Sequence, residues 1–343
     1  MNRAPNVTER YLDEATPRGA SLMKREVVLP VLVLALLALV PLTGSAFYTE
    51  VVTKVMIMAM FAMSLDLLVG YTGLVSFGHA AFFGIGAYAY ALLAPKTEAA
   101  SLWLTLPAAI GMGAVAAAVI GLFVLRTKGI YFIMVTLAFA QMFYFVFHDT
   151  NLGGGSDGIT IDFKAEAKLG DIALIDFGNS NQFYYFVLVL LVAAFLFLRT
   201  LLNSPLGRAL QGIKVNEHRM RSLGYQVFWY KLASFTIAGT LAAFAGYLSA
   251  VQTGFANPEI LSWHQSGNVL LMIILGGTGT LYGAIGGAFV FALLENIFEA
   301  LTVHWQLLLG LTIILLVLFL PGGLSEFVAR FISKPVEEHA DDE

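Results

Sequence analysis

Only a few residues in the long apolar stretches of this sequence have side chains that could do chemistry. Asp66, His79 and Gln141 each interrupt an otherwise apolar run. Polar and ionisable side chains in such surroundings are costly, and they mark either a route for a polar solute or a buried hydrogen bond. For Asp66 the two interpretations are equally supported. For His79 and Gln141 a structural hydrogen bond is the stronger alternative.

Two glycine-rich motifs are further candidates. One lies between Asp66 and His79, and the other lies about 200 residues downstream. "GYTG" occupies residues 70–73 and "GGTGTLYG" occupies residues 276–283, each between an apolar run and a Gly/Ala-rich segment. Adjacent glycine and threonine interrupt a helix, and irregular backbone at membrane depth persists only inside protein or beside a wet cavity. Transporters place their pathways at such discontinuous helices. Close helix packing is the alternative.

We therefore treat the polar residues and both motifs as candidates for one transport pathway. The candidate pathway residues are Asp66, Gly70, Tyr71, Gly73, His79, Gln141, Gly276, Gly277 and Gly279.

Signatures of catalysis are missing from the sequence. There is no phosphate-binding loop of the Walker type, no Ser/His/Asp arrangement and no metal-ligand cluster, and the chain has no cysteine. We expect no enzyme, no metal site and no cofactor on this chain. Energy for uphill transport would come from another polypeptide or from an ion gradient.

The composition indicates which elements must position these residues. The chain of 343 residues is 58% hydrophobic and 12% charged, with mean hydropathy +0.79, whereas soluble domains are about 45–50% apolar and 25% charged. Runs long enough to cross a bilayer recur throughout. We expect an all-α polytopic membrane protein with about nine or ten spans and discontinuous helices at the glycine motifs. The expected spans lie near residues 27–42, 51–69, 78–94, 103–125, 130–148, 183–202, 231–250, 267–275 with 283–298, and 305–320.

The distribution of basic residues predicts the orientation. Most of the 19 Lys and Arg residues fall on one side if the N-terminus is cytoplasmic. This gives a cytoplasmic arm at 1–26, a transmembrane domain at 27–322 and an acidic cytoplasmic tail at 323–343. Within the domain, loop 149–182 lies outside, where "GITIDF" and "DIALIDF" could form a hairpin, and loop 203–230 lies inside.

The quoted motifs belong to blocks that resemble a known family. "SLDLLVGYTGLVSFGHAAFFGIGAYAYALL", "LRTKGIYFIMVTLAFAQM", "GGGSDGI", "SPLGRALQGIKVNEHRMRSLGY", "KLASFTIAGTLAAFAGYLSA" and "ILGGTGTLYGAIGGA" are similar to the permeases of branched-chain amino acid ABC importers, over roughly residues 55–322. The chain looks most like the longer of the two paralogous permeases. Asp66 departs from the pattern, in which we expect a neutral residue, often asparagine.

This resemblance implies a setting and a set of partners. It implies a bacterial inner-membrane subunit that forms a heterodimer with the shorter permease. Two cytoplasmic ATPase subunits would carry ATP and Mg, and a periplasmic binding protein would deliver branched-chain or similar apolar amino acids. Lipid is the other contact, and no nucleic acid is expected.

The resemblance also implies a role for the inner loop. Residues 204–224 look like the coupling segment by which such permeases grip their ATPases, with a helix bracketed by Gly207 and Gly224. Charged residues would bind the ATPase, and apolar residues at helical spacing would fill a cleft on it. The candidate coupling residues are Gly207, Arg208, Leu210, Ile213, Asn216, Glu217, Arg219, Arg221, Leu223 and Gly224. A solvated connector is the alternative.

Three rival functions remain open at this point. A urea or short-amide ABC importer has a permease with the same motifs. An ion-coupled carrier or channel would need no segment for holding an ATPase. A purely structural membrane subunit would need no breaks in its helices.

Overall fold

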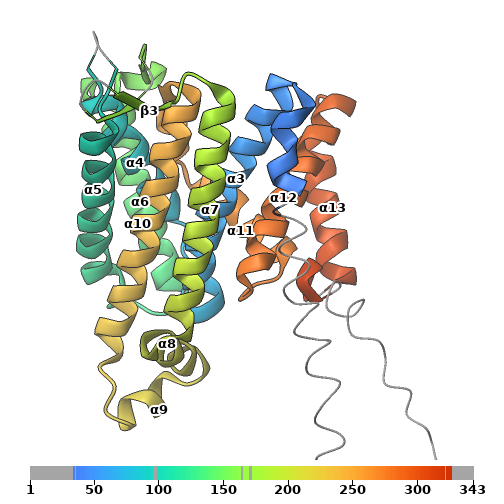
Figure 1. Ribbon diagram of the computed structural model, residues 1–343. Helices are drawn as coiled ribbons and strands as arrows, with labels where there is room; N and C mark the ends of the chain where they lie inside the picture. Colours follow the sequence, from blue (N-terminus) through green and yellow to red (C-terminus); the bar gives the residue numbers. More distant parts are fainter. Residues whose placement is uncertain are drawn as a thin grey trace, which may run out of the picture.

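The computed structural model describes residues 34, 36–95, 99–163, 165–169, 172–320 and 322–326. The predicted arm at 1–26 and most of the predicted tail at 323–343 lie outside these residues, as does half of the first expected span. Within the described part the chain is a helical bundle with two small β-sheets at one end (Figure 1).

Six helical segments are long and apolar enough to cross a membrane. They are α3 with the π-helical turn η2 (Ala46–Thr72), α5 (Leu102–Val124), α6 (Ile130–Asp149), α7 (Ser180–Asn203), α10 (Val227–Thr253) and α12 (Leu281–Leu301). Shorter apolar helices are α4 (His79–Leu93) and α13 (Trp305–Phe319), and the helix α11 (Trp263–Gly276) lies between α10 and α12 in the chain. The prediction of a polytopic helical membrane protein is confirmed, and each expected span from 51–69 onward overlaps one of these helices.

Close backbone contacts between helices explain many of the glycines. A Cβ on Gly86 of α4 would lie 1.8 Å from the carbonyl oxygen of Ala243 in α10, and one on Gly246 would lie 1.8 Å from that of Phe83. Small residues allow this approach where van der Waals contact, rather than the hydrophobic effect, holds helices together in lipid. The glycines of "GIGAYAYA" therefore serve packing.

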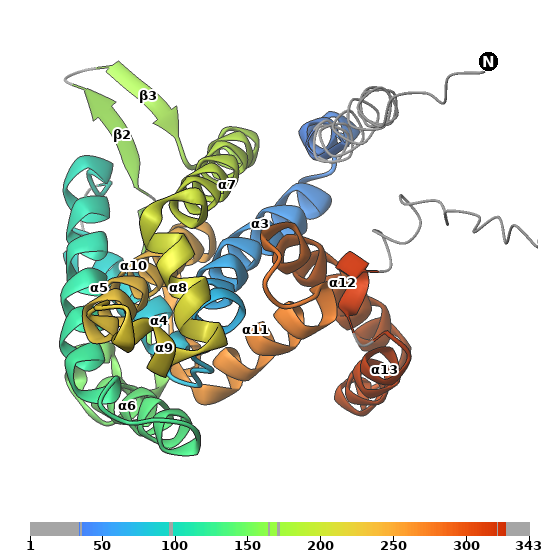
Figure 2. The same ribbon diagram turned by 90° about the horizontal axis from the view of Figure 1, so that it is seen from below.

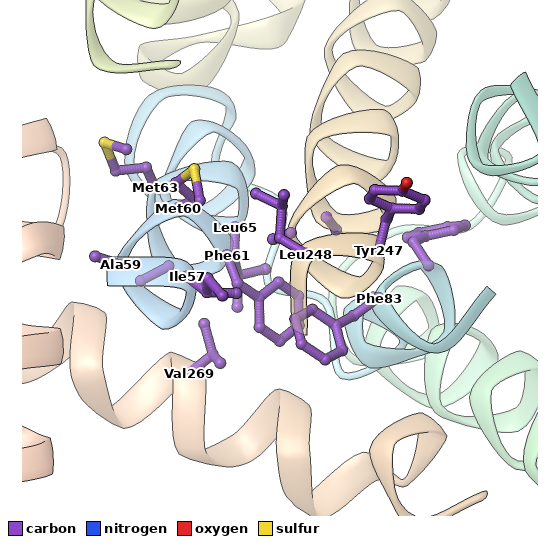
Figure 3. Close-up of a cluster of buried hydrophobic side chains, with 14 of the residues drawn as sticks. Ile57, Ala59, Met60, Phe61, Met63, Leu65, Phe83, Tyr247, Leu248 and Val269 are labelled. Carbon is purple, nitrogen blue, oxygen red and sulfur yellow. The ribbon is translucent and has the colours of Figure 1, made fainter. Parts of the chain in front are cut away.

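The core lies where α3, α4 and α10 meet. The rings of Phe61 and Phe83 are 4.6 Å apart between centroids, and Leu248 and Val269 lie beside them (Figure 3). Tyr247 is fully buried, and its hydroxyl is 2.8 Å from that of Thr105 in α5. Seen from below, α5 and α6 lie on one side of this centre, while α11, α12 and α13 lie on the other (Figure 2).

The two loops that the sequence predicts on opposite sides of the membrane lie at opposite ends of the bundle (Figure 1). One end carries the antiparallel hairpin of β2 (Glu166–Leu169) and β3 (Ile172–Asp176); the other carries α8 (Pro205–Val215) and α9 (Glu217–Ser222). The expected pairing of "GITIDF" with "DIALIDF" is wrong. The stretch "GITIDF" contains strand β1 (Ile159–Thr160), which pairs instead with β4 (Phe255–Ala256) just after α10.

Candidate functional site

The first glycine motif ends a helix in an unusual way. Helix α3 (Ala46–Asp66) continues as the π-helical turn η2 (Leu67–Thr72), so "GYT" does not itself interrupt the helix as expected. The chain leaves the helix at Gly73, whose φ of 76° suits glycine, and α4 begins only at His79. Single π-helical turns within α-helices occur frequently at functional sites.

The second motif separates α11 from α12. Helix α11 ends at Gly276, and α12 begins at Leu281. Gly277 and Gly279 have φ values of 105° and 82°, which side chains with a Cβ rarely adopt. A Cβ on Gly276 would lie 1.8 Å from the carbonyl oxygen of Gly283, so close packing of the two helices also requires glycine there.

The two breaks lie against each other, and Asp66 joins them. Its Oδ1 accepts a hydrogen bond of 2.9 Å from the backbone N–H of Gly279. A Cβ on Gly70 would lie 2.5 Å from both the Cα and the nitrogen of Gly279. Tyr71, beside them, interacts with the backbone of Leu281 at the start of α12. We call the contact of Asp66 and Gly70 with Gly279 the break junction.

The break junction is closed. Asp66 is fully buried, and its Oδ2 has no hydrogen-bond partner within the described residues. A side chain at position 70 would collide with both Asp66 and Gly279, because its Cβ would lie 2.4 Å from Oδ1 of Asp66 and 2.5 Å from the Gly279 backbone. A solute that crosses at this point would therefore require the two breaks to separate.

A lysine from the inner segment contacts this junction. Lys214, near the end of α8, donates a hydrogen bond from its Nζ to the carbonyl oxygen of Gly70. Its Cγ would lie 3.3 Å from a Cβ on Gly73. Sequence reasoning missed Lys214. The only available signal was its position on α8, beside residues already assigned to coupling.

His79 and Gln141 do not belong to the junction. The Nε2 of His79 is 2.9 Å from the hydroxyl of Ser64, and its ring stacks on Phe61. This geometry matches the structural alternative for a buried histidine. Gln141 lies on α6 and is half-buried, and no hydrogen bond joins it to Asp66, Gly70 or Gly279 in the described chain.

The inner segment differs from the single helix that the sequence predicts. Ser204 caps α8, so the helix begins at Pro205, and Gly207 lies inside it rather than at its start. A Cβ on Gly207 would lie 2.3 Å from the carbonyl oxygen of Leu202, which explains the glycine by packing. Asn216 ends α8 and caps α9 by accepting from the N–H of Arg219. Gly224, with φ of 88°, follows α9 as expected.

Two apolar residues assigned to an ATPase cleft are not available to it. Leu210 and Ile213 are 0% and 3% exposed because α8 buries them against its own chain. The exposed apolar side chains of the segment are instead Val215 at 86% and Leu223 at 65%, with Trp229 at 58% just beyond it. Only Leu223 was expected. Val215 lies two residues after Ile213, which places it on the opposite face of the helix.

The expectation that Glu217 binds a partner conflicts with its contacts inside the chain. Its carboxylate lies 2.9 Å from Nζ of Lys231 in α10 and 3.3 Å from that of Lys128, and it also pairs with Arg221. Partial burial acts to raise the pKa of Glu217, but the hydrogen bonds and charges of the two lysines outweigh it and lower the pKa. Glu217 therefore anchors α9 to the bundle. Arg208 and Arg219 remain exposed.

Comparison with known proteins gives consistent matches over most of the chain. The family model described as the permease component of branched-chain amino acid transport systems matches residues 47–318. The high-affinity branched-chain amino acid transport system permease protein LivM of Escherichia coli is 32% identical over 89% of this chain and 76% of its own length. The protein of that name from Salmonella typhimurium is 31% identical over 83% and 71%.

A third relative is matched over a shorter part. The autoinducer 2 import system permease protein LsrC of Klebsiella pneumoniae is 31% identical over 37% of this chain and 39% of its own length. No solved structure matches the chain. Since the family match spans every described helix from α3 to α13, the chain belongs to the family of permease components of branched-chain amino acid transport systems.

Proposed function

We propose that this permease is the membrane-spanning path of an ATP-driven importer for branched-chain or similar apolar amino acids. One observation carries the mechanism: the break junction is closed by backbone contact and is tied by Lys214 to a segment outside the apolar bundle. A closed junction that is hydrogen-bonded to the inner segment fits a transporter that an external ATPase opens through that segment. Permeases of this kind do not themselves hydrolyse ATP, so the chain is not an enzyme.

The proposed partners follow from the surfaces of the chain. The complex would hold two ATPase subunits, which carry ATP and Mg, and one of them would dock on α8 and α9 of this chain. The exposed basic residues Arg208 and Arg219, together with Val215 and Leu223, offer charged and apolar contacts for them. A paralogous permease would cover part of the exposed apolar helix faces, and a periplasmic binding protein would deliver the substrate at the hairpin end.

The proposed topology places α8 and α9 in the cytoplasm. The loop 203–230 is rich in Lys and Arg, and such loops remain on the cytoplasmic side. The hairpin of β2 and β3 then lies on the periplasmic side, because it is at the other end of the bundle (Figure 1). The N-terminus is cytoplasmic in this arrangement, and the full count of spans is nine or ten.

The substrate is the least constrained part of this proposal. The two relatives matched over most of the chain are named for branched-chain amino acids, whereas the relative matched over 37% is named for autoinducer 2. Sharing these helices therefore does not by itself identify the cargo. A urea or short-amide importer is the alternative within the same architecture. An ion-coupled carrier is disfavoured, because it would need no inner segment for holding an ATPase.

Uptake by a strain that lacks the chain tests this function. We expect uptake of labelled leucine, isoleucine or valine to fall on deletion and to return with the intact gene, but not when the partner ATPases carry inactive nucleotide sites. An unchanged uptake of all three amino acids, with loss of urea or acetamide uptake, would assign the alternative cargo. Uptake that persists without ATPases and follows an ion gradient would contradict the importer itself.

A further inference from the structure

We propose that Lys214 is the positioning residue through which movement of α8 and α9 opens the break junction, an inference that rests on the proposed docking of ATPases to this segment. Lys214 touches neither ATP nor substrate in this role. It holds one backbone carbonyl of the junction, and it moves with the helix that carries it.

The end of the helix at Gly73 leaves that carbonyl without a helical N–H partner. In a regular α-helix the carbonyl of Gly70 would accept from the N–H of Leu74. Here the N–H of Leu74 donates to the carbonyl of Leu68 instead, at 2.8 Å. The carbonyl of Gly70 is left for a side chain, and the Nζ of Lys214 donates to it. Because a buried carbonyl needs a partner, Lys214 satisfies an acceptor that the helix end leaves unpaired.

Lys214 belongs to a helix that is packed firmly against the rest of the chain. Helix α8 buries Leu210 and Ile213 and packs against α7, η2 and α10. The next helix, α9, is held to α10 through Glu217 and Lys231. A push on the exposed face of this segment therefore shifts the helix as a unit, and the ammonium group of Lys214 must follow it or release Gly70.

On the other side, Gly70 packs directly against Gly279. The two glycines are in backbone contact, and Asp66 accepts from the N–H of Gly279. The sequence of contacts from Lys214 through Gly70 and Asp66 to Gly279 thus joins the inner segment to both helix breaks.

The first test measures coupling in the complete complex, reconstituted with its ATPases and binding protein in proteoliposomes. With leucine as the probe, we expect Lys214→Met to keep assembly and basal ATP hydrolysis but to lower leucine uptake per ATP at least tenfold. Lys214→Arg keeps a cation and a donor and should retain most of the uptake. Lys54→Met is the matched control, since Lys54 is exposed and lies roughly 18 Å along α3 from Asp66 at the helical rise. It should transport normally.

A second test restores the ammonium group at position 214 on an already folded protein. The chain has no cysteine of its own, so in Lys214→Cys the new thiol is its single reactive site. S-aminoethylation rebuilds a side chain of lysine length and charge, whereas a neutral methylthio group does not. We expect only the aminoethylated complex to regain uptake. The unsubstituted complex treated with the same reagents controls for cysteines in the partners.

A third measurement does not depend on the substrate. Amide hydrogen exchange in peptides that cover residues 67–74 and 276–281 should change between the nucleotide-free and ATP-bound complex. In Lys214→Met that change should disappear, although the ATPases still bind nucleotide. This result would support the link even if leucine proved to be the wrong cargo, so the inference and the substrate assignment fail separately.

Two results would overturn the inference. One is a wild-type ratio of uptake to hydrolysis in Lys214→Met, together with an unchanged exchange response. The other is equal loss of assembly in Lys214→Met and Lys214→Arg with no rescue by aminoethylation, which would assign Lys214 a purely structural role.

Discussion

The carboxylate of Asp66 accepts a hydrogen bond of 2.9 Å from the backbone N–H of Gly279. The two residues lie far apart in sequence: Asp66 is the last residue of α3 before the π-helical turn, and Gly279 lies in the break between α11 and α12. This bond bears on both interpretations that the sequence leaves open for Asp66. The residue is a hydrogen-bonded structural group in the closed state, and it also lies at the point where the candidate pathway would have to open.

Substitutions at Asp66 should separate its hydrogen bond from its charge. Asp66→Leu removes the acceptor for Gly279 N–H, so we expect loss of uptake and a stability loss of about 1–3 kcal/mol. Asp66→Asn keeps an oxygen acceptor in the same place and should retain the fold and at least part of the uptake. Uptake assays and thermal unfolding in detergent measure the two effects. Normal uptake by Asp66→Leu would show that the junction is not needed for transport.

Glycines of the two breaks should not tolerate side chains. Gly73→Leu and Gly279→Leu force a residue with a Cβ into φ values of 76° and 82°, at roughly 1–2 kcal/mol each. The new Cβ would also lie 3.3 Å from Lys214 or from the carbonyl of Gly70. We expect both variants to assemble but to lose uptake. Gly111→Leu is the control, because a Cβ there meets nothing within 4 Å. If both break variants transport normally, the breaks do not shape the route.

Sequence reasoning predicted the helices well because each one has its own apolar run. It also identified both glycine motifs, since glycine next to threonine is a local signal. Their contact is not local: nothing in the sequence pairs Gly70 with Gly279, and only the folded bundle brings them together. The same limit hid Lys214, whose role depends on the carbonyl of Gly70 that the helix end at Gly73 leaves free.

The errors in the inner segment have a related cause. Helical spacing identified Leu210 and Ile213 as one apolar face but could not say whether that face meets a partner or the chain's own bundle. The structure buries it in the bundle. Likewise, the charge of Glu217 was visible in the sequence, but Lys231 lies in the next helix and Lys128 in a different loop.

Cross-linking can test which face of the inner segment meets the ATPase. Single cysteines at Arg208, Val215 and Leu223, all exposed, should cross-link to a cysteine on the ATPase with a yield that changes with nucleotide. Cysteines at Leu210 and Ile213 should not react, because these positions are buried in the chain. Cross-links only at the buried positions would mean that α8 leaves the bundle to dock. No cross-link at any of the five would favour a solvated connector.

Thiol labelling in intact cells can test the orientation. A cysteine in place of Ser156 lies at the hairpin end and one in place of Ser222 lies on α9, and both positions are exposed. We expect a membrane-impermeant maleimide to label the first in intact cells and the second only after the membrane is opened. The reverse pattern would invert the proposed topology and remove α8 and α9 from the reach of cytoplasmic ATPases.

The network around Glu217 should hold α9 in place without contacting the ATPase. Glu217→Lys replaces attraction to Lys231, Lys128 and Arg221 with repulsion, whereas Glu217→Gln keeps an acceptor for Lys231 and loses only the charge. Since partly exposed ion pairs are worth up to about 1 kcal/mol each, we expect Glu217→Gln to be nearly normal. Glu217→Lys should displace α9, with uptake falling while basal ATP hydrolysis persists.

The pH dependence of this network gives an independent check. Because the lysines lower the pKa of Glu217, its contribution is fully present above the ordinary glutamate pKa of about 4.3 and is lost as the pH falls through the lowered value. Hydrogen exchange at residues 217–222 should therefore be insensitive to pH above 5, after correction for the intrinsic rate, and should increase below about 4. In Glu217→Gln this acid step should vanish. An acid step of equal size in Glu217→Gln, or normal coupling in Glu217→Lys, would show that other contacts hold α9 in place.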